Sequence, residues 1–246
     1  MTNIKLIALD MDGTLLNDDG VVTEYTKDII QQTLRKSIHV VLSTGRPLIM
    51  CLDFVEQLTL PSYIITSNGA EIWTADNELI EQHTMDPSKI KSLWEMGKDL
   101  HVHMWLLASG EVFVDDMVPE DFTSYDWLKI GFGKLSNQEK SYILEQIKDD
   151  PTIEVSNSSR TNIEVTKKGV HKARAIQSIC ERLNIKMEEV MAIGDSLNDI
   201  KMIERAGIGV AVKNAQSKVI EKADYITATN NEDGVAKAIE KFVLNV

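Results

Sequence analysis

Short apolar runs alternate with amphipathic stretches over the first 83 residues of the chain. The apolar runs are rich in β-branched residues, as in "IKLIALD", "HVVLSTG" and "SYIITSNG", which is typical of strands buried on both faces of a sheet. Between the first two runs, "TKDIIQQTLRKS" places Ile29, Ile30 and Leu34 on one face, and this spacing predicts an amphipathic helix. Strands that alternate with helices predict a parallel sheet with right-handed crossovers.

The same alternation returns after Gly169. The amphipathic segments "HKARAIQSICERL", "LNDIKMIERA" and "DGVAKAIEKFV" predict helices, and the apolar segments "VMAIGD", "IGVAV" and "DYITA" predict strands. We therefore expect residues 1–83 and 169–246 to form one discontinuous α/β domain.

The segment between these two parts has a different pattern. A helical stretch, "PSKIKSLWEMGKDL", precedes the strand-like runs "HVHMWLL" and "EVFVDD", and a second helical stretch precedes "TIEVSN" and "NIEVTK". Strands joined by short turns are typical of an antiparallel α+β module, so we expect an inserted α+β domain at residues 84–168. The aromatic residues Trp105, Tyr125 and Trp127 are interpreted as the core of this insert rather than as a platform for a substrate.

Composition narrows the class of protein. Of the 246 residues, 43% are hydrophobic and 26% are charged, as in ordinary soluble globular proteins. The net charge of -12 argues against nucleic acid or an anionic membrane as a partner, because both require a basic surface. Cys51 and Cys180 have no metal-type spacing and are expected to be buried thiols. Because no apolar run is long enough for a signal peptide or a membrane span, we expect a cytoplasmic protein.

Polar residues gather where the apolar runs end. Asp10 and Asp12 follow the first run, Thr44 and Gly45 follow the second, and Asp195 follows a later one. The carboxyl ends of parallel strands meet at one edge of a sheet, where ligands bind, so these residues are expected to converge. Two neighbouring aspartates repel each other, which leaves two interpretations: a solvated turn, or a site that a cation completes.

Four motifs bear on that choice. In this order, "DMDGT", "STGR", "GVHKARAI" and "GDSLNDIKM" resemble the four sequence motifs of the haloacid dehalogenase (HAD) superfamily of phosphatases. The insert is similar to the type IIB cap of the Cof-type sugar-phosphate phosphatases. The resemblance covers nearly the whole chain and implies a Rossmann-like α/β core with a parallel sheet and an inserted α+β cap. It also implies a Mg²⁺-dependent phosphatase that hydrolyses a small phosphomonoester through an aspartyl-phosphate intermediate.

The resemblance implies a role for each matching residue. Asp10 would be the nucleophile, Asp12 the general acid and base, and Lys172 the cation that orients Asp10 and neutralises the transition state. Mg²⁺ would be held by Asp10, Asp195 and the backbone carbonyl of Asp12. The groups that would bind the phosphoryl oxygens are the Thr44 hydroxyl, the amides of Gly45 and Met11, and Asn198, with Asp199 supporting Lys172 or the metal-bound waters.

For several positions the sequence leaves more than one interpretation open. Lys167 and Lys168 compete with Lys172 for the lysine role, although Lys172 matches the motif best. Arg46 and Arg160 are candidates for holding the leaving group of the substrate. Asn68 is either a turn residue or part of the junction between the cap and the core.

The expected partner is a small phosphorylated metabolite. A sugar phosphate or a similar phosphorylated polyol is the best candidate, and a phosphorylated riboflavin precursor or a nucleoside monophosphate is an alternative. Two other functions would use a similar site: a phosphomutase, and a non-catalytic sensor that should have lost Asp10, Asp12 or Lys172, all of which are present. The chain is expected to act as a monomer or a homodimer.

Overall fold

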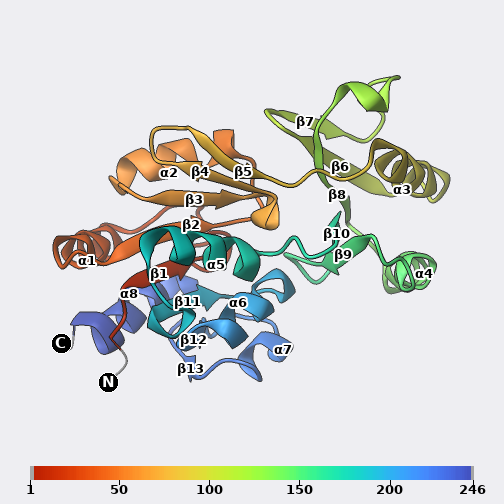
Figure 1. The fold of residues 1–246 in the computed structure, drawn as a ribbon. Coiled ribbons are helices and arrows are strands. Elements are labelled where there is room, and N and C mark those ends of the chain that lie inside the picture. Colours follow the sequence, from red (N-terminus) through yellow and green to blue (C-terminus); the bar gives the residue numbers. More distant parts are fainter. Residues whose placement is uncertain (1–2, 245–246) are drawn as a thin grey trace.

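The computed structural model describes residues 3–244 and contains two sheets (Figure 1). The larger sheet has eight strands in the order β13-β12-β11-β1-β2-β3-β4-β5. From β13 to β3 neighbouring strands are parallel, and β4 and β5 extend the sheet in antiparallel pairing. The strands are β1 (Leu6–Leu9), β2 (His39–Ser43), β3 (Tyr63–Thr66), β4 (Glu71–Thr74), β5 (Leu79–Gln82), β11 (Val190–Gly194), β12 (Ile208–Ala211) and β13 (Tyr225–Ile226).

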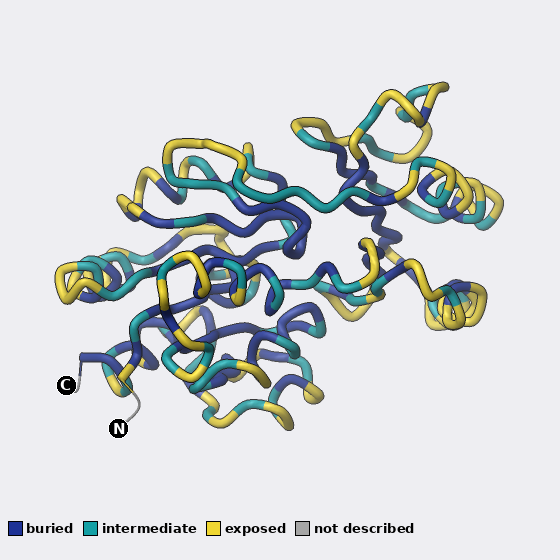
Figure 2. Tube along the Cα trace, in the orientation of Figure 1, coloured by how far each residue is buried: buried dark blue, intermediate teal, exposed yellow. Residues whose placement is uncertain are grey.

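Helices cover both faces of this sheet. Successive strand residues point to opposite faces, so Leu6 and Ala8 pack in one apolar cluster with α5, whereas Ile7 and Leu9 pack in another with α1 and α8. The strands of the sheet centre are therefore buried, while the outer turns of the helices are exposed (Figure 2). The helices of this part are α1 (Glu24–Arg35), α2 (Leu52–Gln57), α5 (Lys172–Leu183), α6 (Ile200–Arg205), α7 (Ser217–Ile220) and α8 (Gly234–Ile239).

The smaller sheet has five antiparallel strands in the order β7-β6-β8-β10-β9 and lies between β5 and α5 in the chain. Two helices lie on its side away from the larger sheet (Figure 1). We call this α+β unit the cap, and the rest of the chain the core. The cap elements are α3 (Pro87–Asp99), β6 (His103–Ala108), β7 (Glu111–Val114), β8 (Trp127–Gly133), α4 (Asn137–Ile147), β9 (Ile153–Ser156) and β10 (Ile163–Lys167).

The two faces of the cap sheet differ in character. Leu106 of β6 and Ile130 of β8 belong to the apolar cluster that α3 and α4 complete. The alternating neighbours Trp105 and Lys129 point to the opposite face, where they line a cavity shared with the core. The cap thus turns a face that is partly apolar and partly charged toward the carboxyl ends of the core strands.

The predicted fold is confirmed, with a parallel-sheet α/β core and an inserted α+β cap. Cys51 and Cys180 are buried free thiols, as expected. Trp127 is buried in the cap core, whereas Trp105, for which the same place was predicted, lies on the face toward the core. Within residues 3–244, no helix combines the length and the hydropathy needed to cross a bilayer.

Candidate active site

The acidic residues after β1 and β11 meet one buried lysine. Asp10 follows β1, Asp199 lies in the short turn after β11, and Lys172 is the first residue of α5. The Lys172 Nζ lies 2.6 Å from Asp10 Oδ1 and 2.7 Å from Asp199 Oδ1. Lys172 and Asp199 have 0% of their surface exposed and Asp10 has 5%. Lys172, rather than Lys167 or Lys168, therefore forms the ion pair with Asp10.

The carboxylates of Asp10, Asp195 and Asp199 form a cluster whose oxygen atoms lie within 4.8 Å of one another. Burial and the charge of Asp199 raise the pKa of Asp10 well above its usual value, and raise the pKa of Asp195 to about 7, although Lys172 opposes both shifts. Such mutual repulsion is what a divalent cation relieves, and carboxylate oxygens are the ligands that Mg²⁺ prefers. The residues present therefore fit a Mg²⁺ ion.

Asp199 is held on both sides of its carboxylate. Its Oδ1 accepts from Lys172, and its Oδ2 accepts from the backbone amides of Asp195 and Ser196, each at 3.0 Å. Asp10 and Asp195 are thus the better placed ligands for a cation. Gly13 leaves room for Asp195, because a Cβ on Gly13 would lie 3.0 Å from Asp195 Oδ2 and the residue has a φ of +75°.

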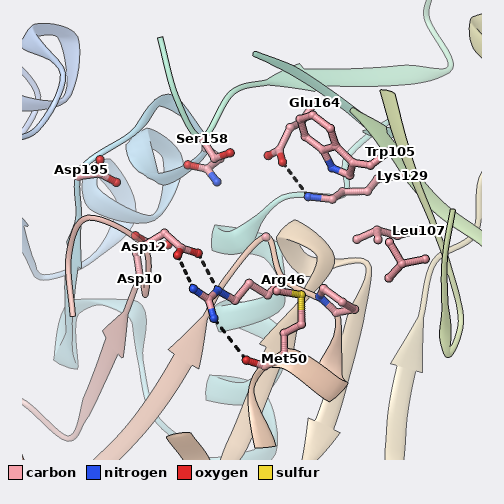
Figure 3. A pocket seen from close by; sticks show the side chains of 14 residues that line it. Asp10, Asp12, Arg46, Met50, Trp105, Leu107, Lys129, Ser158, Glu164 and Asp195 are labelled. Carbon is pink, nitrogen blue, oxygen red and sulfur yellow. Dashed lines mark hydrogen bonds and ion pairs between the residues drawn. The ribbon is translucent and has the colours of Figure 1, made fainter. Parts of the chain in front are cut away.

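The side chain of Asp12 lies apart from this cluster. Its two oxygens accept from Arg46, from Nε at 2.9 Å and from Nη2 at 2.6 Å (Figure 3). The Asp12 side chain is 56% exposed and that of Arg46 is 22% exposed. A bidentate arginine fixes the orientation of a carboxylate, so Arg46 holds the Asp12 side chain away from the acidic cluster in this state.

The loop after β2 supplies the next polar groups. Thr44 is fully buried, and its hydroxyl oxygen accepts from the Arg46 amide at 3.1 Å, which directs the hydroxyl proton elsewhere. A Cβ on Gly45 would lie 3.0 Å from Asn68 Oδ1 and 3.2 Å from Lys129 Nζ, so the glycine allows both side chains to lie close to the backbone here. The side chain of Met11 belongs to the core, which leaves its backbone for any contact in the site.

A cavity of about 260 Å³ lies between these core groups and the cap (Figure 3). One part of its wall is charged or polar and the other is apolar. The polar part consists of Asp10, Asp12, Arg46, Lys129, Ser158, Glu164, Asp195 and Asn198, and the apolar part of Pro47, Met50, Trp105, Leu107 and Val112, with Gly45 between them. A ligand that is anionic at one end and apolar at the other would match this wall.

The predicted residues fall into three groups. Four of them are fully buried and are not part of the cavity wall: Met11, Thr44, Lys172 and Asp199. Asp10, Asp12, Gly45, Arg46, Asp195 and Asn198 line the cavity, whereas Arg160 is exposed and lines a separate cavity beside α4 and α7. Asn68 does join the core to the cap, because its Nδ2 donates to Glu164 Oε2 at 2.7 Å.

Sequence reasoning missed Lys129, Glu164 and Trp105 as residues of the cavity wall. One signal was present in "WLKIGFG". Glycines inside a strand indicate that another group approaches closely, and a Cβ on Gly131 would lie 2.1 Å from Trp105 Cε2. The glycines of β8 therefore make room for the indole on the face that also carries Lys129.

Comparisons with known proteins agree with this architecture. The sequence profile of the haloacid dehalogenase-like hydrolases matches residues 7–141 and 124–239. The 5-amino-6-(5-phospho-D-ribitylamino)uracil phosphatase YcsE of Bacillus subtilis is 44% identical over 242 residues, which span 98% of this chain and 97% of YcsE. The putative phosphatase YxeH of the same bacterium is 32% identical over 266 residues, which span 98% of both chains.

Solved structures show the same fold. A haloacid dehalogenase-like hydrolase from B. subtilis has a TM-score of 0.89 and 25% identity, over 98% of this chain and 100% of that one. The HAD subclass IIB sugar phosphatase BT4131 has a TM-score of 0.84 and 26% identity, over 97% and 98% of the two chains. The capped α/β fold and the buried acid–lysine cluster define an enzyme of the phosphatase class. The chain belongs to the haloacid dehalogenase-like hydrolase family, among its Cof-type members with a subclass IIB cap.

Proposed function

We propose that the chain is a Mg²⁺-dependent phosphomonoesterase that cleaves a small phosphorylated metabolite through an aspartyl-phosphate intermediate. One observation carries the proposal: Asp10 lies in the cavity wall, its carboxylate bound to the buried Lys172 and close to Asp195. A positioned nucleophilic carboxylate, a fixed cation and a set of metal ligands are the groups that phosphoryl transfer requires.

Asp10, Asp195 and the backbone carbonyl of Asp12 would hold the Mg²⁺ ion. When bound, it offsets the negative charge of the phosphoryl group and of the carboxylates. The Thr44 hydroxyl, the amides of Gly45 and Met11, and the side chains of Lys172 and Asn198 would bind the phosphoryl oxygens. We assign no role to Arg160, because it lines another cavity.

In the first step, a carboxylate oxygen of Asp10 attacks phosphorus and the bond from phosphorus to the leaving oxygen breaks. Asp12 gives its proton to that oxygen, which leaves as an alcohol. In the second step, Asp12 takes a proton from a water molecule that attacks the aspartyl-phosphate, and inorganic phosphate is released with Asp10 restored. Because Arg46 occupies both carboxylate oxygens of Asp12, we propose that Arg46 turns to the substrate before the first proton transfer.

The cavity wall supports a choice among substrates. Beyond the polar residues lie Trp105, Met50 and Val112, and the last two are 51% and 46% exposed. A leaving group with a flat or apolar part would cover these side chains. The relative YcsE is named for a phosphate ester in which a ribityl chain joins the phosphate to a uracil ring. We therefore rank that compound ahead of a simple hexose phosphate and a nucleoside monophosphate for this chain.

The test is phosphate release from these three compounds, with and without Mg²⁺, by the wild type and by Asp10→Asn. We expect release to require both the metal and Asp10, with the ribityl compound having the highest kcat/KM. Asp53→Asn, an exposed acid on α2, is the matched control and should leave the rate unchanged. No release from any compound by the wild type would contradict the proposal, and isomerisation that needs a bisphosphate activator would indicate a phosphomutase.

A further inference from the structure

We propose that Lys129 of the cap binds the phosphoryl group of the substrate, and that Glu164 and Asn68 are positioning residues that hold its ammonium group over Gly45. The proposal rests on the phosphatase function proposed above and adds a cation that the cap, rather than the core, contributes.

The position of Lys129 supports a contact with the phosphoryl group. Its Nζ lies 3.2 Å from the point that a Cβ on Gly45 would occupy. The amide of Gly45 is one of the groups assigned to the phosphoryl oxygens, so the ammonium lies beside that part of the cavity. Lys129 is 1% exposed and lines the same cavity as Asp10 (Figure 3). The ammonium is therefore shielded from bulk solvent and lies at the wall of the site cavity.

A contribution to the free energy of unfolding does not explain why Lys129 is buried in the cap. Lys129 Nζ and Glu164 Oε1 lie 2.8 Å apart, with side chains 2% and 3% exposed. The cost of removing two charges from water offsets most of the attraction in such a pair, and apolar residues of similar size are often at least as stable. A buried ion pair on a cavity wall is a candidate for function instead.

The ammonium group of Lys129 also has N–H donors that are not engaged by the described residues. An ammonium group has three N–H donors, and among residues 3–244 its one hydrogen bond is to Glu164. The cavity is otherwise rich in carboxylates, which repel a phosphate dianion. A fixed ammonium at its edge lowers that repulsion and can donate to a phosphoryl oxygen.

A chain of hydrogen bonds connects this lysine to the core. Glu164 Oε2 accepts from Asn68 Nδ2 at 2.7 Å, and Asn68 Oδ1 accepts from Asn198 Nδ2 at 3.1 Å. Asn68 has a left-handed backbone with a φ of 60° in the turn after β3, which aims its side chain at the cap. Burial raises the pKa of Glu164, but the charge of Lys129 and the bond from Asn68 outweigh it and keep that pKa low.

The direction of this chain also orients Asn198. Ionised Glu164 accepts, so Asn68 must donate to it with its amide nitrogen and accept with its oxygen. Asn198 must then give its nitrogen to Asn68, and its Oδ1 is buried with no partner among the described residues. The same relay that holds Lys129 therefore uses one hydrogen of Asn198 Nδ2 and leaves the other as the donor that could bind a phosphoryl oxygen.

The experiment compares Lys129→Met with Lys89→Met, which removes a cap lysine whose ion pair with Asp150, at 2.6 Å, lies outside the site cavity. The measured quantities are KM, kcat and the dissociation constant of inorganic phosphate in the presence of Mg²⁺. Losing a hydrogen bond to a charged group predicts a rise of about 10- to 100-fold in KM and in the dissociation constant of phosphate. Lys89→Met should change neither.

Two further variants separate binding from folding. Lys129→Met leaves Glu164 buried without its cation, so Lys129→Met/Glu164→Gln removes both charges and should keep the fold while losing phosphate affinity by the same factor. Glu164→Gln alone keeps the ammonium but loosens it, and a smaller rise in KM is expected, with partial recovery of phosphate affinity relative to the double variant.

The outcomes are distinct. Unchanged phosphate affinity in the folded double variant would overturn the proposal, even if KM rises, because Lys129 would then contact the leaving group or nothing. Phosphate binding can be measured in protein that shows no turnover. A wild type that binds phosphate through Lys129 but releases none from any ester would contradict the phosphatase function and leave the Lys129 assignment standing.

Discussion

At the scale of single residues, the proposed mechanism requires Asp12 to be both a proton donor and a proton acceptor. In the structure both of its carboxylate oxygens accept from Arg46. Both roles become possible if substrate takes over the guanidinium, because the Asp12 carboxyl can then face the leaving oxygen. Asp12 gives its proton to that oxygen and regains one from the attacking water, which restores the starting state.

This division of labour predicts different results for two leaving groups with Asp12→Asn. An alkyl phosphate needs a proton on its leaving oxygen, so its turnover should fall about 10²- to 10⁴-fold. p-Nitrophenolate leaves without a proton, so only the second step should be slow. Rapid-quench measurements should show a burst of about one p-nitrophenol per enzyme. Equal slowing of both compounds without a burst would contradict the assignment of Asp12.

At the scale of elements, the first turn of α5 places Lys172. His171 is the N-cap, and its Nδ1 accepts from the Arg174 amide at 3.1 Å. Burial and the charges of Lys201 and Arg205 lower the pKa of His171 to about 4, so the ring is neutral and Nδ1 can accept. The position of Lys172 thus depends on a hydrogen bond at the N-terminus of α5 that forms only while the His171 ring is neutral.

His171→Ala is expected to cost about 1 kcal/mol in the free energy of unfolding, or about 2–4 °C in Tm. The direction of the pH dependence follows from the lowered pKa of His171. The contribution is present above the unfolded value of about 6.5 and is lost as pH falls toward about 4. The loss should appear as a smaller difference in Tm between the wild type and His171→Ala at pH 5 than at pH 7.5. His171→Asn, which keeps an acceptor, should retain the stability at both pH values. A difference in Tm between the wild type and His171→Ala that is equal at pH 5 and pH 7.5 would contradict this role of His171.

Elements also explain which parts of the site the sequence could predict. Asp10 and Asp195 follow runs that are apolar at every position, and the convergence of parallel strand ends is a general rule, so their meeting was predictable. Lys129 is a single charge within a strand, which normally indicates a solvated face. Whether that face meets water or another layer depends on how the cap packs on the core, and no local pattern contains this information.

At the scale of the whole molecule, the cap is hydrogen-bonded to the loop that carries Asp195, a proposed metal ligand. The Asn157 carbonyl accepts from the Asn198 amide at 3.0 Å, and the Ser158 carbonyl accepts from the Ser196 hydroxyl at 3.2 Å. These bonds connect the β9–β10 loop to the segment just after Asp195.

The raised pKa values of Asp10 and Asp195 predict how Mg²⁺ and pH act on stability together. Without metal, the folded state holds protons that the unfolded state, with a pKa near 3.8, releases. The contribution of these two carboxyl groups to the free energy of unfolding is therefore fully present below about pH 4. It is lost as pH rises through about 7, the pKa of Asp195. Mg²⁺ competes with these protons and requires ionised ligands.

The Mg²⁺-induced rise in Tm should consequently be larger at pH 8 than at pH 5.5, at equal ionic strength. Asp195→Asn removes one of the repelling charges and one ligand together. Its metal-free Tm should fall less between the two pH values, and its response to Mg²⁺ should be lost at both. If Mg²⁺ raised Tm equally at pH 5.5 and pH 8, or raised it in Asp195→Asn as in the wild type, the ion would be binding elsewhere, because only a site made of these buried carboxylates links the two effects.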